Sequence, residues 1–213
     1  MKSKINSLYR FNINKRIFQG DIFTDMNMIS YEVEENKKEN KIEVNYEKII
    51  FPYLIVVSQD CDLELDFNKR ELIENNSLDN KESEKQSYDK FLDSILVCPA
   101  FPSEDLKEGN HLKDMGRIIG NIPTKRWKTV KNNDNPRYHY LDKGKIKDND
   151  GNEVMIDSLA IDFKKYYTIP RNYLYYYKKD KYIASLNELI REDLSNRFAY
   201  FLSRIGLPEF NEE

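Results

Sequence analysis

The segment Gln59-Asp60-Cys61-Asp62 combines an amide, two carboxylates and a thiol directly after the most apolar stretch of the chain, residues 49–57. Polar side chains at the end of a buried strand project from a rigid scaffold into a loop, so Asp60 or Asp62 is a candidate general base or cation ligand. The alternative is an Asx turn, in which these carboxylates accept local backbone N–H bonds and Cys61 packs as a small apolar side chain. Two flanking acidic groups disfavour a thiolate, which argues against a nucleophilic Cys61.

A second segment, residues 124–140, interleaves cations with aromatic rings. Lys and Arg bind phosphates while Trp, Tyr and His stack on bases, a combination typical of proteins that bind single-stranded nucleic acid. The residues expected to bind RNA are Lys125, Arg126, Trp127, Lys128 and Tyr138. In the same hypothesis His139 is the general base, and Arg137 or Lys128 is the cation that stabilises the transition state. The alternative is a solvated basic loop with Trp127 and Tyr138 packed onto the body of the protein.

Six tyrosines lie between residues 166 and 177, next to lysines at 164, 165, 178 and 179. We expect them on strands, where tyrosine covers a half-exposed sheet well, and we favour sheet packing or a protein interface over base stacking. Cys98 lies inside an apolar run and is expected in the core. With His111 and His139 as the two histidines, no convincing metal-ligand set can be assembled, so neither a metal nor a cofactor is expected.

The overall composition excludes several classes of protein. The 213 residues carry 34 Lys and Arg against 37 Asp and Glu, a net charge of −3, so no global positive field attracts nucleic acid or membrane. No apolar run approaches the ~18 residues of a membrane helix, and the first residues lack the apolar region of a secretory leader. Two cysteines are too few for a disulfide framework. We therefore expect a cytoplasmic protein that does not contact membranes.

Hydrophobic patterning predicts the elements that position these residues. Strands are expected at residues 17–23, 49–57, 95–100, 154–163 and 166–170, from their apolar and β-branched content. Residues 32–48 are expected to form a hairpin tip or mobile loop, and residues 63–93 a partly helical or disordered excursion. A terminal helix is predicted from a capping box at Ser185 and Glu188, with apolar residues at helical spacing as far as Ile205.

Four landmarks occur in an order that resembles the MazF/PemK toxin family. They are Gly20-Asp21-Ile22, the proline-led strand that closes on Val56-Val57-Ser58-Gln59-Asp60, Ile95-Leu96-Val97-Cys98-Pro99-Ala100, and Tyr167-Thr168-Ile169-Pro170-Arg171-Asn172-Tyr173-Leu174 before a terminal helix. The resemblance implies a mainly β fold with helices (α+β): a small SH3-like barrel with a C-terminal helix, in a single domain over residues 1–213. The excess length then corresponds to loop insertions at residues 28–48, 63–93 and 102–153.

The family's activity implies an RNA-cutting toxin that an antitoxin restrains, but two of its positions are substituted here. The usual catalytic arginine corresponds to Phe51, and the usual Thr or Ser falls near Phe101, with Ser103 two residues later. The leading hypothesis is a metal-independent endoribonuclease that acts on single-stranded RNA in prokaryotic stress or phage defence, with Asp60, Arg137 and His139 as catalytic residues. The alternative is a catalytically degenerate module that binds a protein, either an antitoxin or a regulatory subunit in a CRISPR-linked defence operon. A homodimer is compatible with both.

Overall fold

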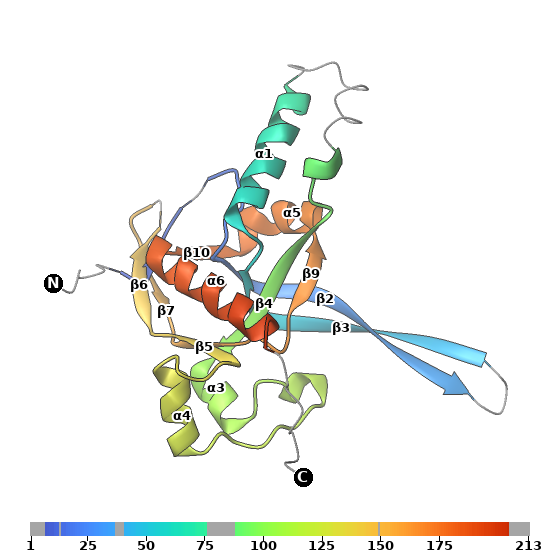
Figure 1. Cartoon of the computed structure of the whole chain (residues 1–213), viewed down its shortest axis with the longest axis vertical. Coiled ribbons are helices and arrows are strands. Elements are labelled where there is room, and N and C mark those ends of the chain that lie inside the picture. The colour runs from blue at the N-terminus through green and yellow to red at the C-terminus, as the bar shows by residue number, and fades with distance from the viewer. Residues whose placement is uncertain (1–6, 13, 37–40, 76–87, 149, 205–213) are drawn as a thin grey trace, which may run out of the picture.

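A twisted antiparallel sheet forms the centre of the molecule, and helices cover both of its faces (Figure 1). The computed structural model describes residues 7–12, 14–36, 41–75, 88–148 and 150–204. The strands are β1 (Tyr9–Arg10), β2 (Asp21–Asn36), β3 (Lys41–Val56), β4 (Ser94–Pro102), β5 (Tyr138–Leu141), β6 (Gly144–Lys147), β7 (Glu153–Ile156), β8 (Leu159–Asp162), β9 (Tyr167–Pro170) and β10 (Tyr182–Leu186). The α-helices are α1 (Asp60–Glu74), α3 (Ser103–Glu108), α4 (Thr124–Lys131), α5 (Arg171–Lys181) and α6 (Glu188–Leu202), and short 3-10 turns lie at Tyr88–Lys90 and Lys113–Met115.

The sheet order is β1-β10-β2-β3-β4-β8-β5, and β9 pairs with the part of β4 that precedes its contact with β8. Within the described residues β1 and β5 are its edges, so the sheet is not closed. A separate hairpin consists of β6 and β7. The expected α+β class is therefore confirmed at this level.

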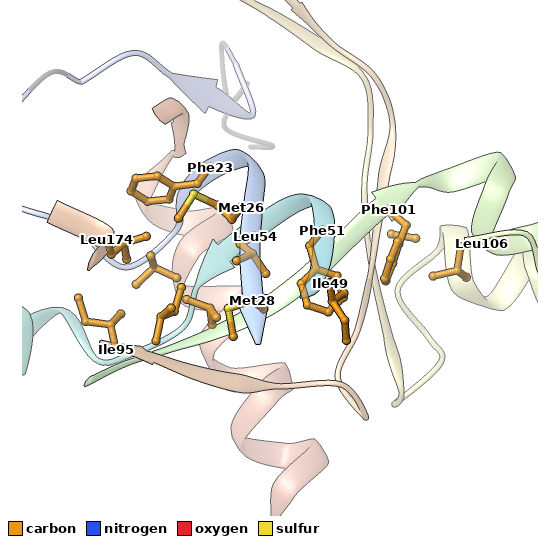
Figure 2. Packing of buried hydrophobic residues seen from close by; sticks show 14 of the residues in the cluster. Phe23, Met26, Met28, Ile49, Phe51, Leu54, Ile95, Phe101, Leu106 and Leu174 are labelled. Atoms are coloured by element: carbon orange, nitrogen blue, oxygen red, sulfur yellow. The ribbon is translucent and has the colours of Figure 1, made fainter. Parts of the chain in front are cut away.

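Alternating side chains on the central strands supply two hydrophobic clusters, one on each face of the sheet. On β3, Leu54 enters one cluster and its neighbour Ile55 the other, and both are fully buried. Helix α6 covers one face with Leu194 and Phe198. The opposite face is covered by residues of α1, α3, α4 and α5, namely Leu63, Leu106, Trp127, Val130 and Leu174. Figure 2 shows this second cluster as a continuous band from Phe23 and Leu174 past Phe51 to Phe101 and Leu106. A sheet buried on both faces accounts for the apolar runs that predicted β3 and β4.

The first segment expected as an insertion is a β-ribbon. Strands β2 and β3 remain paired in register from Met26 opposite Phe51 to Asn36 opposite Lys41, and this ribbon projects away from the body (Figure 1). Of the two expectations for residues 32–48, a hairpin tip or a mobile loop, the described part shows the hairpin: the alternation Ile42-Glu43-Val44-Asn45-Tyr46 has the two-residue period of a strand. Residues 37–40 lie outside the described residues.

The other two expected insertions contain regular structure. Residues 63–93 include most of α1 and the 3-10 turn at Tyr88–Lys90, and residues 76–87 lie outside the described part. Residues 102–153 contribute α3 and α4, and also β5, which joins the main sheet.

Two local predictions near the C-terminus were wrong. Four of the six clustered tyrosines lie on helix α5 rather than on a strand, and the rings of Tyr173 and Tyr177, one turn apart, are in tilted contact with centroids 4.7 Å from each other. Ser185 does not cap the last helix: it lies in β10 and donates a hydrogen bond to Asp21, while Asn187 precedes the first helical residue. The predicted end of that helix at Ile205 lies outside the described residues.

Candidate functional site

Two Phe-Pro sequences split the sheet and open a cleft. The pairing of β3 with β4 ends at Tyr53 opposite Ala100, and the next residues are Pro52 and Phe101-Pro102. Proline has no backbone N–H, so Pro52 and Pro102 cannot donate a hydrogen bond that would continue the pairing between β3 and β4. From here β3 continues with β2 alone into the ribbon, while β4 pairs with β8. The two halves of the sheet diverge, and side chains of both line the space between them.

The cleft has a volume of about 450 Å³ and combines an apolar floor with acidic walls. Pro52, Pro102 and Met115 supply apolar surface, and the fully buried Phe101 borders the cleft. Its described lining also carries four carboxylates, Asp25, Glu47, Asp105 and Asp114, against the single ammonium group of Lys48. The cleft is therefore suited to a ligand that is apolar along its length and cationic at its end.

Asp25 lines the cleft from an irregular position in β2. It has φ of 47°, in the left-handed region, and it lies opposite Pro52, between the pairs Thr24 with Tyr53 and Met26 with Phe51. Aspartate tolerates the left-handed conformation better than most residues. Backbone strain of this type concentrates at binding and catalytic sites.

His111 is the second unusual residue of the cleft. Its ring packs edge-on against Phe101, with centroids 4.8 Å apart. Both ring nitrogens are shielded from solvent and have no hydrogen-bond partner among the described residues. Burial is the main cause that lowers the pKa of His111 below its usual value, so the ring is neutral at neutral pH. A neutral imidazole can accept one hydrogen bond and donate another, but a ligand reaches these nitrogens only if the ring turns out of its present position.

The two positions at which the resemblance expects catalytic groups lie beside this cleft. Phe51 and Phe101 are both fully buried, with ring centroids 6.3 Å apart in an edge-to-face contact (Figure 2). The nearby Ser103 is 3% exposed, and its hydroxyl is hydrogen-bonded to that of Ser158 at 2.6 Å. None of these three side chains presents a free polar group to the cleft.

Asp60 is the first residue of α1 and is held by groups from two other segments. Its carboxylate accepts hydrogen bonds from Arg16 Nη2 at 3.0 Å and from the Gln19 backbone N–H at 3.1 Å, and Arg191 Nη1 of α6 lies 3.8 Å away. Neighbouring Cys61 is exposed as a free thiol, whereas Cys98 is buried. This arrangement ties the N-terminal segment to α1 and α6.

Arg137 and His139 are engaged in separate internal contacts. Arg137 forms two hydrogen bonds with the fully buried carboxylate of Asp162, at 2.8 and 2.6 Å. His139 is 1% exposed, and its Nδ1 accepts a hydrogen bond from Arg197 Nε at 3.1 Å. Burial, with the nearby Arg197 charge, lowers the pKa of His139 to about 3. In this conformation His139 is neutral and inaccessible to a substrate.

Helix α4 presents the basic segment to solvent. Lys125, Arg126, Lys128 and Lys131 are all exposed, and no carboxylate lies on the helix. Trp127 is 6% exposed and packs edge-on against Tyr140, with centroids 6.2 Å apart. Tyr138 is also buried, beneath the guanidinium of Arg137. The cations of this segment are therefore available to phosphate, whereas its two expected stacking rings are in the core.

The predicted catalytic residues do not share one site. Within the described part of the chain, no hydrogen bond or ion pair joins Asp60 to Arg137 or His139; each of the three is held by its own partners. Sequence reasoning did not bring Asp25 together with Asp105 and His111, because Asp25 is far from the other two in the chain. The repeated Phe-Pro at 51–52 and 101–102 is the signal that could have located the cleft.

In the part of the chain that the structure covers, no cluster of three or more His, Cys, Asp or Glu is placed to hold a metal ion. No described helix has both the length and the apolar character needed to cross a bilayer. In comparisons with known proteins, no family model, no curated protein and no solved structure matched this chain.

Proposed function

We propose that this chain is a protein-binding module whose acidic cleft receives a cationic side chain from an extended or helical segment of a partner. The observation that carries the proposal is the cleft's composition: four carboxylates and one ammonium group together with the apolar side chains of Pro52, Pro102 and Met115. Arginine and lysine have an apolar stem and a charged head, so they match both parts of this surface. Arginine fits best because its planar fork can bind a carboxylate with two parallel hydrogen bonds.

Electrostatics favour such a ligand over an RNA phosphate at this cleft. Two unit charges separated by 8 Å interact by about 2 kcal/mol at an effective dielectric constant near 20. Each uncompensated carboxylate therefore attracts a guanidinium and repels a phosphate by an amount of this order. Phe51 and Phe101, at the positions where the resemblance expects Arg and Thr or Ser, offer neither a cation nor a proton carrier. In this proposal the chain is a divergent relative of the MazF/PemK fold and its SH3-like barrel, with partner binding in place of cleavage.

A second candidate function is the single-stranded RNA activity expected from the sequence. The four exposed cations of α4 favour it, because phosphate contacts need accessible Lys and Arg rather than paired ones. Binding on α4 requires no change in structure. Cleavage by Asp60, Arg137 and His139 requires their present contacts to open.

The test measures binding of defined probes to the purified full chain by fluorescence anisotropy. The first probe is a labelled 12-residue peptide in which Arg alternates with Leu and Ser, and its counterpart carries Gln in place of Arg. We expect the Arg peptide to bind, and the double variant Asp25→Asn, Asp105→Asn to weaken that binding at least tenfold. Asparagine suits the left-handed backbone at position 25, so the fold should be preserved.

The matched control removes two exposed carboxylates that lie outside the cleft, Glu64→Gln with Glu192→Gln. It should change the peptide's affinity less than twofold. If both double variants lost peptide affinity equally, the loss would be due to the change in net charge rather than to the cleft, and the proposal would be overturned. The second probe is a 20-nucleotide single-stranded RNA. Cleavage by the wild-type chain that is lost in Arg137→Ala would favour the endoribonuclease over the binding module.

A further inference from the structure

The ribbon formed by β2 and β3 has one apolar face and one acidic face. Residues that pair across two antiparallel strands share a face. One face carries Ile29 with Lys48, Tyr31 with Tyr46, Val33 with Val44, and Glu35 with Ile42. The other carries Ser30 with Glu47, Glu32 with Asn45, and Glu34 with Glu43. A ribbon solvated on both sides would be polar on both, so this pattern indicates that the first face is covered by a partner.

The apolar face is open to solvent in the single chain. Ile29 is 76% exposed, Tyr31 68%, Ile42 72% and Tyr46 75%. Val33, Val44 and Ile50 of the same face are also exposed. At these exposed fractions the seven side chains together expose on the order of 700 Å² of surface to solvent. This area is above the largest apolar patch of a typical monomer and close to the ~800 Å² that each partner buries in a standard interface.

We propose that a second copy of this chain covers this face, with the two ribbons packed face to face and antiparallel. A two-fold axis makes the same surface serve both partners, so the patch must complement itself. In the antiparallel arrangement the Tyr31 and Tyr46 pair of one ribbon lies on the Val33 and Val44 pair of the other. Large and small side chains then alternate across the interface, as dense packing requires.

The two charged residues of the apolar face select this orientation. Lys48 lies near the base of the ribbon and Glu35 near its tip, three pairs of residues away, on the order of 20 Å at the strand rise. Antiparallel packing brings Lys48 of one copy beside Glu35 of the other, at both ends. Parallel packing would bring Lys48 beside Lys48 and Glu35 beside Glu35, which is repulsive. This inference does not depend on the proposed function: Lys48 and Ile50 line the cleft as well as this face, but the peptide test changes Asp25 and Asp105 whereas the dimer test changes Tyr31 and Tyr46, so each proposal can fail alone.

The experiment measures the mass of the full chain by sedimentation equilibrium between about 1 and 100 μM. We expect a dimer, and we expect Tyr31→Thr with Tyr46→Thr to raise its dissociation constant at least 100-fold. Threonine retains strand propensity, so the ribbon should stay folded, and an unchanged circular dichroism spectrum checks this. The matched control Glu34→Thr with Glu43→Thr alters the opposite face and should not weaken the dimer.

Charge exchange tests the orientation. Lys48→Glu and Glu35→Lys should each weaken the dimer at least tenfold, and the double variant should return to within about threefold of the wild type. A wild-type chain that is monomeric throughout the range overturns the proposal. A dimer that is indifferent to the two threonine substitutions, or a double charge variant weaker than either single one, overturns it as well. Dimerisation that appears only with RNA or another protein added would assign the face to that molecule instead.

Discussion

Removing the titration of His139 should flatten the acid dependence of stability. In the folded protein the pKa of His139 is lowered to about 3, chiefly by burial, whereas an unfolded chain has the usual value near 6.5. Between these two values the unfolded state binds more protons, so stability falls as the pH is lowered. Each pH unit corresponds to about 1.4 kcal/mol, so at pH 5 the loss relative to pH 7 is about 2 kcal/mol. Above pH 6.5 the titration of His139 contributes almost nothing to the pH dependence of stability.

The variant His139→Asn keeps an oxygen acceptor for Arg197 Nε and removes the proton site. Urea unfolding followed by the fluorescence of Trp127, the single tryptophan, gives the free energy of unfolding at pH 7.5, 6 and 5. The wild type should lose about 2 kcal/mol more than the variant between pH 7.5 and 5. The buried carboxyl of Asp21, whose pKa is raised to about 6 mainly by desolvation, opposes this trend between pH 3.8 and 6 in both proteins and cancels in the comparison.

Parallel pH profiles of the two proteins would refute this reasoning. They would mean that His139 is protonated in the folded state and is paired with Asp193, whose Oδ2 lies 3.9 Å from Nδ1, rather than accepting from Arg197. The variant His111→Asn tests the second histidine in the same way. The pKa of His111 is also lowered by burial, so its removal should shift stability at pH 5 in the same direction.

Three further predictions concern packing and reactivity. Asp162→Ala leaves a guanidinium without its bidentate partner and should destabilise the fold by about 3 kcal/mol in urea unfolding; a change below 1 kcal/mol would contradict this. Gly144→Ala would place a methyl group 2.6 Å from an aromatic carbon and should cost about 1–3 kcal/mol, whereas Gly120→Ala, which meets no atom within 4 Å, should be nearly neutral; equal melting temperatures would argue against the contact. A thiol reagent should label Cys61 in the native protein and Cys98 only after unfolding, since Cys98 is buried and burial raises its pKa; labelling of both at similar rates would refute the burial.

The parts of the fold that the sequence predicts correctly are those that local patterns determine. The strands around residues 49–57 and 95–100 are apolar and β-branched because both faces of the sheet are buried, so a run of such residues suffices to identify them. The last helix follows from apolar residues at helical spacing. The ribbon was expected only as one of two alternatives, a hairpin tip or a mobile loop, because glutamate interrupts its apolar alternation, although the two-residue period is present over residues 41–46.

The errors at the site have a common physical cause, which is a partner distant in the sequence. Ser185 and Glu188 have the spacing of a capping box. The hydroxyl of Ser185 instead donates a hydrogen bond to Asp21, 164 positions earlier. His139 lies in a basic, aromatic segment that favours an exposed surface, but Arg197, 58 positions later, holds it in the interior. Composition describes a segment's average polarity, and such single long-range hydrogen bonds decide which of its side chains are accessible.

Strand β10 has a consequence for how the chain folds during synthesis. It lies between β1 and β2, so the edge of β2 near Asp21 stays unpaired until residues 182–186 have left the ribosome. At ~5–20 residues per second, this interval is on the order of 10–30 s. The β2–β3 hairpin, whose contacts are local, forms within microseconds of its emergence. A nascent chain therefore carries an open sheet edge and a formed apolar ribbon for seconds, during which ribbons on neighbouring ribosomes of one message can meet, and assembly can begin before either chain is complete.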